Sequence, residues 1–108
     1  MINAEELKDL LKDTLEKNKG NDIAIFDVGR KTALARYMIV ASGNSSRHVK
    51  SLAEYTIKTL KQYGKINVEG MEEGNWVAVG FHDVIIHILK SDVREYYQID
   101  ELWNDVAL

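Results

Sequence analysis

One stretch of the chain could bind an anion. Residues 42–48 read Ser-Gly-Asn-Ser-Ser-Arg-His, and Gly43 provides a residue that tolerates a positive φ angle. Backbone N–H groups at the start of a helix attract negative charge, and Arg47 and His48 lie beside them. The stretch lacks the second glycine and the following lysine of a phosphate-binding loop. We therefore favour the simpler interpretation, a turn from strand to helix in which Ser45 or a neighbouring side chain caps the helix.

The other residues capable of chemistry do not form a recognisable site. The histidines are His48, His82 and His87, predicted at a helix start, in a hairpin turn and within a strand. A zinc site needs three or four converging ligands, and the chain has no cysteine. No pair of aspartates stands at a strand end to hold a metal for phosphoryl transfer. We therefore expect no metal, no cofactor and no catalytic group, and we expect His87 to form a hydrogen bond at the sheet surface.

Composition narrows the possible classes of protein. The chain has 108 residues, of which 45% are hydrophobic, so it can form the core of a single domain, residues 1–108. The sequence shows neither a membrane-spanning run nor a signal peptide, so we expect a cytoplasmic protein without a membrane partner. The net charge of −3, without a basic segment, predicts little direct contact with nucleic acid.

A strand, a helix and a second strand form the centre of the predicted fold. Tyr37–Ala41 is a short apolar run typical of a buried strand. Arg47–Gln62 carries apolar residues at three- and four-residue spacing, which predicts an amphipathic helix. Lys65–Glu69 is the next candidate strand. This order predicts a right-handed crossover that joins two parallel strands.

The remaining segments complete a mixed five-stranded sheet of the α/β (α+β) class. A helix begins near Asn3, and a strand at residues 22–28 is expected to pair antiparallel with residues 37–41. Residues 76–79 and 84–89 predict a β-hairpin, and a short helix follows it. Two long helices can cover only one face of five strands. Because the hairpin strands are apolar on both faces, we expect an apolar patch on the second face, and such a patch usually marks an interface.

We predict that this interface lies on the tryptophan strand. The expected partner-binding residues are Trp76, Val77, Val79, Tyr37 and Met38. Large aromatic residues often dominate the energy of an interface. The alternative is that Trp76 belongs to the core, in which case a charge at this position would unfold the domain.

Several segments together resemble the ribosomal silencing factor family, RsfS or Iojap. They follow in the family's order and cover nearly the whole chain: residues 27–28, 37–49, 69–70, 76–79, 83–87, 94–97 and 102–103. The family-motif residues among them are Ser42, Gly43, Ser45, Arg47, His48, Asp83 and His87. The resemblance implies a fold similar to nucleotidyltransferases without catalytic activity. It also implies a homodimeric translation repressor that binds the fourteenth protein of the large ribosomal subunit and blocks subunit joining when nutrients are scarce.

Three positions depart from the family pattern. Arg36 and Gly80 replace acidic residues, and His82 replaces a turn glycine, which predicts a positive φ angle for a residue other than glycine. Three hypotheses follow. The chain is a ribosome-binding repressor, a nucleotide-binding or nucleotidyl-transferring enzyme, or a dimerisation module.

Overall fold

Five strands form one mixed sheet in the computed structural model, which describes residues 2–108. The strands are β1 (Asn21–Phe26), β2 (Tyr37–Gly43), β3 (Asn67–Glu69), β4 (Trp76–Phe81) and β5 (Val84–Lys90). Their order across the sheet is β1-β2-β5-β4-β3. Strand β2 pairs parallel with β5, and the other neighbours pair antiparallel. The predicted mixed five-stranded sheet and the predicted pairing of β1 with β2 are confirmed.

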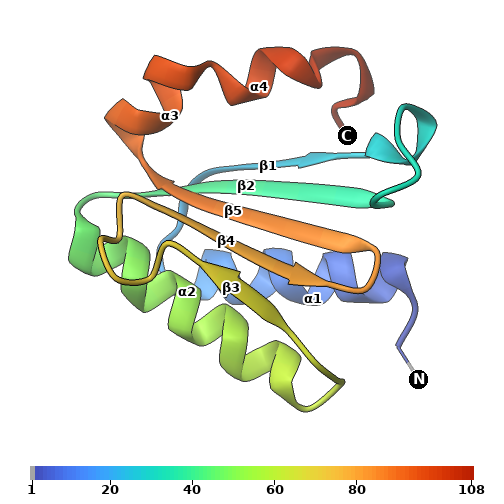
Figure 1. Cartoon of the computed structure of the whole chain (residues 1–108), viewed down its shortest axis with the longest axis horizontal. Helices are drawn as coiled ribbons and strands as arrows, with labels where there is room; N and C mark the ends of the chain where they lie inside the picture. Colours follow the sequence, from blue (N-terminus) through green and yellow to red (C-terminus); the bar gives the residue numbers. More distant parts are fainter. Residues whose placement is uncertain (1) are drawn as a thin grey trace.

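Two layers of helix enclose the sheet (Figure 1). Helices α1 (Ala4–Lys17) and α2 (Ser46–Lys61) cover one face. The short helices α3 (Ser91–Tyr97) and α4 (Ile99–Leu102) cross the other face, together with the 3-10 turn Asn104–Val106. A second 3-10 turn, Val28–Arg30, follows β1. The long helices therefore lie on one face as predicted, and the end of the chain gives the second face a partial cover.

The crossover from β2 through α2 differs in one respect from the prediction. Strands β2 and β3 do run in the same direction, but β5 and β4 lie between them. The chain reverses after β3 and again after β4, so β5 returns to the position beside β2. The parallel neighbour of β2 is therefore β5, whose residues 84–90 pair in register with residues 37–43.

Alternation along the strands divides the core into two clusters. The first lies beneath α1 and α2 and includes Leu11, Ile39, Leu52, Val79 and Ile86, all of which are fully buried. The second lies beneath the C-terminal elements and includes Phe26, Val28, Met38, Val40, Leu89, Ile99 and Val106. All seven residues of β2 are buried, because this central strand contributes to both clusters.

Helix ends follow the expected capping chemistry in two places. Asn3 and Glu6 form a capping box at the start of α1, where the sequence predicts a helix to begin, and the Ser45 hydroxyl accepts from the backbone N–H of His48 at the start of α2. Lys19, rather than Gly20, takes the left-handed conformation after α1, with a φ angle of 65°.

Among residues 2–108, no helix is both long enough and apolar enough to span a membrane.

Two glycines near β4 should respond oppositely to substitution by alanine. Gly70 has a φ angle of +89°, and a Cβ atom there would lie 2.0 Å from the Trp76 carbonyl oxygen. Gly80 lies within β4 with no atom within 4 Å of its Cβ position. We expect Gly70→Ala to lower the free energy of unfolding by more than about 1 kcal/mol, and Gly80→Ala to raise it by about 0.4–1 kcal/mol. Urea unfolding of both variants measures the difference, and equal effects would contradict the described backbone.

Candidate partner-binding site

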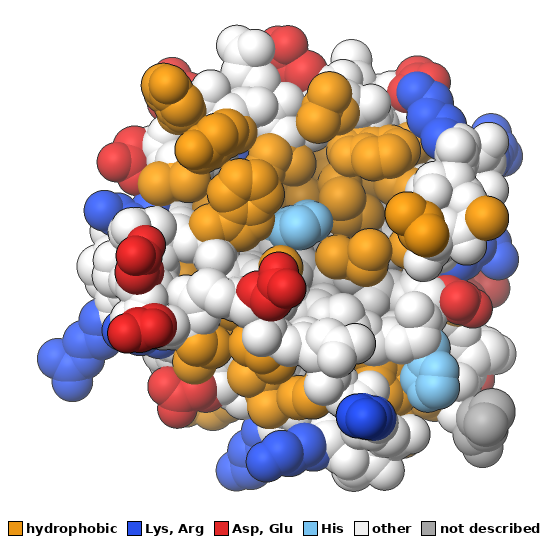
Figure 2. All heavy atoms as spheres, in the orientation of Figure 1, with side chains coloured by type: hydrophobic (Ala, Val, Ile, Leu, Met, Phe, Trp, Pro, Cys, Tyr) orange, Lys and Arg blue, Asp and Glu red, His pale blue; other side chains and the backbone are white. Residues whose placement is uncertain are grey.

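An apolar hollow opens on the second face of the sheet, between the strands and the C-terminal elements. Its volume is about 280 Å³. All of its lining residues are hydrophobic except Thr32 and His87; the hydrophobic ones are Val28, Leu34, Ala35, Met38, Trp76, Ile85, Ile99, Leu102 and Trp103. Figure 2 shows hydrophobic side chains gathered over this part of the surface. This is the apolar patch that the sequence predicts on the incompletely covered face.

Two leucines stand exposed in the wall of the hollow. Leu34, in the loop before β2, is 84% exposed, and Leu102, at the end of α4, is 68% exposed. A single exposed leucine is ordinary on a protein surface. Two of them beside a hydrophobic cavity extend it into a continuous apolar surface, and such surfaces mark binding sites.

Trp76 and His87 hold each other in position within the hollow. The Trp76 Nε1–H donates a hydrogen bond of 3.0 Å to Nδ1 of His87, and the two rings meet edge to face with centroids 5.8 Å apart. On its other side Trp76 packs against Tyr97 of α3, with ring centroids 5.2 Å apart. Burial lowers the pKa of His87 below its ordinary value of 6.5, because charge is disfavoured in apolar surroundings.

Three of the five predicted partner-binding residues lie on the wrong face of the sheet. Val77 and Val79 are fully buried beneath the long helices, and Tyr37 is only 4% exposed in the same cluster. No partner can reach these residues while the domain is folded. Successive residues of a strand point to opposite faces, so Trp76 and its neighbour Val77 cannot share one surface. Trp76 and Met38 do line the hollow, and their contact with a partner stays a prediction.

The turn from residue 42 to residue 48 is occupied by its own hydrogen bonds. The backbone N–H of Asn44 donates to Nδ1 of His48, and Nε2 of His48 lies 3.3 Å from the Asn18 carbonyl oxygen. Ser45 caps the helix, as the simpler interpretation predicts. Gly43 does not adopt a positive φ angle; its role is close approach, because a Cβ atom there would lie 2.9 Å from the Val49 backbone nitrogen. These bonds use the backbone N–H groups of Asn44 and His48 and both ring nitrogens of His48, so fewer donors remain for an anion.

The family-motif residues do not converge on one site. Ser42 and Gly43 pair with the end of β5, whereas Asp83 lies in the hairpin turn at the opposite end of the sheet. The Asp83 carbonyl oxygen accepts from the backbone N–H groups of Arg36 and Tyr37. Arg47 is exposed at the start of α2. Of this set only His87 lines the hollow. Among residues 2–108, no group of three or more His, Asp or Glu side chains is arranged to hold a metal ion.

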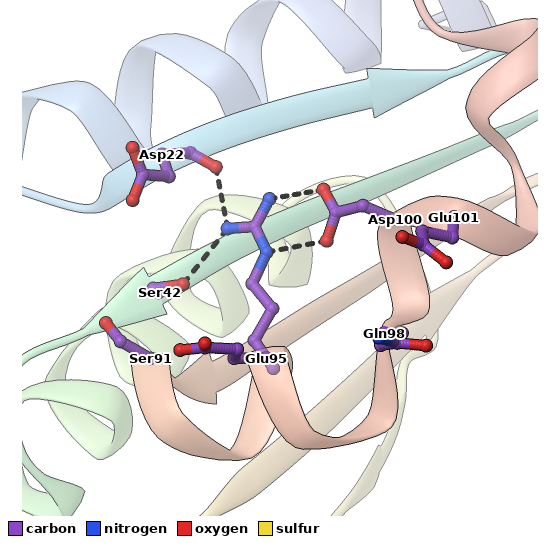
Figure 3. Close-up of a pocket in the computed structure, with 8 residues that line it drawn as sticks. Asp22, Ser42, Ser91, Glu95, Gln98, Asp100 and Glu101 are labelled. Carbon is purple, nitrogen blue, oxygen red and sulfur yellow. Dashed lines mark hydrogen bonds and ion pairs between the residues drawn. The ribbon is translucent and has the colours of Figure 1, made fainter.

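Arg94 forms a polar hub beside the hollow (Figure 3). Its guanidinium makes two hydrogen bonds with the Asp100 carboxylate, of 2.8 and 2.7 Å. It also donates to the Asp22 carbonyl oxygen at 2.7 Å and to the buried Ser42 hydroxyl at 3.0 Å. The guanidinium lowers the pKa of Asp100. The hub therefore fastens α3 and α4 to strands β1 and β2.

The polar pocket around Arg94 is poorly suited to a phosphate. Four acidic residues line it, Asp22, Glu95, Asp100 and Glu101, against one guanidinium. Most donors of that guanidinium are already used, and the surrounding carboxylates would repel a polyanion. We therefore interpret the residues of this pocket as structural, because their hydrogen bonds join the C-terminal helices to the sheet.

The comparisons with known proteins give one consistent result. A family model described as "Ribosomal silencing factor during starvation" matches residues 1–107. Ribosomal silencing factor RsfS of Chromobacterium violaceum is 42% identical over 93% of this chain and 84% of its own length. A crystal structure of a protein from Chromobacterium violaceum superposes with a TM-score of 0.91 at 41% identity, covering 95% of this chain and 88% of that one. The chain belongs to the ribosomal silencing factor family.

A more distant relative widens the context of the family. The mouse protein named "Mitochondrial assembly of ribosomal large subunit protein 1" is 27% identical over 89% of this chain and 44% of its own length. The family relationship confirms the resemblance seen in the sequence. The additional likeness to nucleotidyltransferases stays a prediction.

The departures from the family pattern have structural explanations at two positions. His82 has a φ angle of 48° in the β4–β5 turn, as its place in the turn predicts. Arg36 lies over the Tyr37 ring, 4.7 Å from the centroid, and pairs with Asp27 at 3.3 Å. At Gly80 the space beyond the Cβ position is open, so an acidic side chain would fit there without a clash.

Sequence reasoning missed Arg94, which fastens the C-terminal helices to the sheet, and two exposed leucines that line the hollow, Leu34 and Leu102. Arg94 bonds to residues 52 and 72 positions away in the chain, and no spacing pattern signals such contacts. Leu34 stands between Ala33 and Ala35, and Leu102 directly precedes Trp103, so the neighbouring residues do not signal that these side chains are exposed. Their exposure and their shared cavity depend on the tertiary arrangement.

Removing the Arg94 hub should loosen the C-terminal cover of the sheet. Arg94→Met removes four hydrogen bonds and leaves the Ser42 hydroxyl buried without its donor. We expect the free energy of unfolding to fall by about 2 kcal/mol. The matched control is Arg47→Ala, because Arg47 is exposed and should change stability by less than about 0.5 kcal/mol. Equal effects in urea unfolding would rule out the hub as a brace.

The same hub should give stability a dependence on acid pH. Arg94 lowers the pKa of Asp100 from 3.8, so the ionised carboxylate favours the folded state. Its contribution is fully present above pH 3.8 and is lost as the pH falls through the lowered value. We expect Asp100→Asn to reduce the acid dependence of the free energy of unfolding. If the free energy of unfolding of Asp100→Asn fell with acid pH as steeply as that of the unsubstituted protein, the role assigned to Asp100 would be contradicted.

Proposed function

We propose that the chain is a non-catalytic translation repressor that binds the large ribosomal subunit. In finer detail, it binds the fourteenth protein of that subunit through the apolar hollow and blocks joining of the small subunit under nutrient limitation. Membership of the ribosomal silencing factor family supports the general role. The observation that carries the choice of surface is the hollow itself, with its two exposed leucines.

The chemistry of the hollow suits a protein partner. Its lining has no charged side chain, and its volume of about 280 Å³ leaves room for apolar side chains of a partner. Trp76 is half-buried and braced by His87 and Tyr97, so it offers a rigid aromatic anchor. Rigid aromatic residues at the centre of a water-excluding surface typically carry much of the binding energy.

An enzymatic role has less support. The turn at residues 42–48 is closed by its own hydrogen bonds, and the Arg94 pocket is lined mainly by carboxylates. Titration calorimetry with nucleotide and magnesium tests this alternative directly. Nucleotide turnover that Arg47→Ala abolished would replace the repressor hypothesis with the enzymatic one.

Self-association would use the same surface. The hollow is apolar enough to bind a second copy of the chain, and a homodimer stays our prediction for high protein concentrations. A dimer formed through the hollow would compete with the ribosome for it. Sedimentation velocity over a range of concentrations, with and without large subunits, separates the two occupants.

Charges on the two exposed leucines should weaken ribosome binding without unfolding the protein. Leu34→Glu and Leu102→Glu place a carboxylate where the partner's apolar surface would lie. We expect each to weaken binding to purified large subunits by about thirtyfold, because loss of an interface anchor costs about 2 kcal/mol. Their thermal midpoints should stay near that of the unsubstituted protein, since both side chains are exposed.

Leu108 provides the matched control for this experiment. It is 71% exposed and does not line the hollow, so Leu108→Glu should bind normally. Co-sedimentation measures binding, and a subunit-joining assay measures repression. If the folded Leu34→Glu and Leu102→Glu variants bound as well as the control, the proposed surface would be wrong.

A further inference from the structure

We propose that His87 determines which chemical groups the hollow accepts, by donating a hydrogen bond from its Nε2–H to a backbone carbonyl oxygen of the bound segment. The proposal rests on the proposed function, in which the hollow binds a protein of the large subunit. It adds the chemistry of that partner: an apolar segment with a peptide carbonyl directed at His87.

The tautomer of His87 follows from its bond with Trp76. An indole nitrogen can only donate, so Nδ1 of His87 must accept in the 3.0 Å hydrogen bond between them. A neutral imidazole that accepts at Nδ1 carries its proton on Nε2. Trp76 therefore fixes His87 as a donor at the nitrogen that does not face the indole.

This donor is open to the hollow. Within residues 2–108, the only side-chain hydrogen bond of His87 is the one with Trp76. No side-chain nitrogen or oxygen of the described residues is fully buried without a partner. Because Nε2 has no partner, it must reach the surface, and His87 lines the hollow. In Figure 2 a histidine is visible among the hydrophobic side chains on this part of the surface.

A lone N–H group in an apolar cavity discriminates strongly between ligands. When a partner covers the hollow, an unpaired donor would lose its water and cost about 1–3 kcal/mol. A carbonyl oxygen at that point removes this penalty. An ammonium group or another N–H would instead meet a donor. A peptide carbonyl in an apolar segment fits, because every residue of a protein partner carries one.

Protonation of His87 would disrupt the arrangement. The imidazolium has N–H groups at both nitrogens, so Nδ1 could no longer accept from Trp76. Tyr97 on α3 packs against Trp76, and the carboxylates Glu72 and Glu73, in the loop before β4, line a separate pocket on another side of Trp76. No Asp, Glu, Lys or Arg side chain lines the hollow. Burial lowers the pKa of His87 from 6.5, so the neutral form persists above that pH.

Two amide substitutions separate the two functions of the imidazole. In His87→Asn the amide oxygen takes the place of Nδ1 and can still accept from Trp76, but no donor reaches the Nε2 position. In His87→Gln the amide nitrogen can reach the Nε2 position, but the acceptor for Trp76 is lost. We expect His87→Asn to bind large subunits about tenfold more weakly than the unsubstituted protein, and His87→Gln to bind more tightly than His87→Asn. The reverse order would show that His87 serves only to position Trp76, and would overturn the proposal.

The pH profile of the unsubstituted protein gives a second measurement. Binding of the unsubstituted protein should be constant above pH 6.5 and weaken only as the pH falls through the lowered pKa of His87, where protonation breaks the bond with Trp76. The indole N–H resonance of Trp76 should shift over the same range. His87→Gln should remove this pH dependence. A pH dependence of binding that persists in His87→Gln would show that another group causes it, and would contradict the role given to His87.

Trp76→Ala distinguishes failure of this proposal from failure of the proposed function. If Trp76→Ala abolishes binding while folded His87→Asn binds normally, the hollow is the binding site but His87 does not select the partner. If folded Trp76→Ala, Leu34→Glu and His87→Asn all bind normally, the hollow is not the binding site and both proposals are wrong. Circular dichroism melting of each variant establishes that it is folded.

Discussion

The central constraint on this fold is a sheet that is apolar on both faces. Strand β2 is buried along its whole length, and β5 contributes to both core clusters. Helices α1 and α2 can cover only one face. Everything after β5 therefore has to cover the second face, and α3, α4 and the final 3-10 turn are too short to cover all of it. The hollow is the part of that face left without cover.

The size of the hollow depends on where the C-terminal segment is fastened. Arg94 ties this segment to β1 and β2 through two hydrogen bonds, to the Asp22 carbonyl oxygen and the Ser42 hydroxyl, and its two bonds with Asp100 link α3 to α4. Farther along, Leu108 donates to the Ile25 carbonyl oxygen, and Lys31 pairs with Asp105 at 2.6 Å. These attachments all lie on β1, on β2 or in the connection between them, so they fix the segment over this side of the sheet. The surface around Trp76 and Ile85, towards β4, consequently stays accessible.

Periodicity and turn chemistry were sufficient to predict the elements of the fold, but not their spatial relations. The alternation of β4 correctly separates Trp76 from Val77, yet grouping both in one binding surface ignored that alternation. The position of β5 beside β2 depends on a double reversal of the chain, which no local pattern encodes. The Arg94 contacts join positions far apart in sequence, so no local sequence pattern predicts them either. Ser45, the capping box of α1 and the turn at His82 were predictable because their physics is local.

The electrostatics of the chain bear on what it could recognise on a ribosome. The net charge is −3, and ribosomal RNA presents dense negative charge, so the two surfaces repel at long range. A hollow without charged side chains gains nothing from phosphate and most from excluding water. Within the proposed function, these properties favour an exposed protein surface over the surrounding RNA. Apolar contact alone selects weakly between partners. The Nε2–H of His87 would add selectivity, because leaving a buried donor without an acceptor costs more binding free energy than forming its hydrogen bond gains.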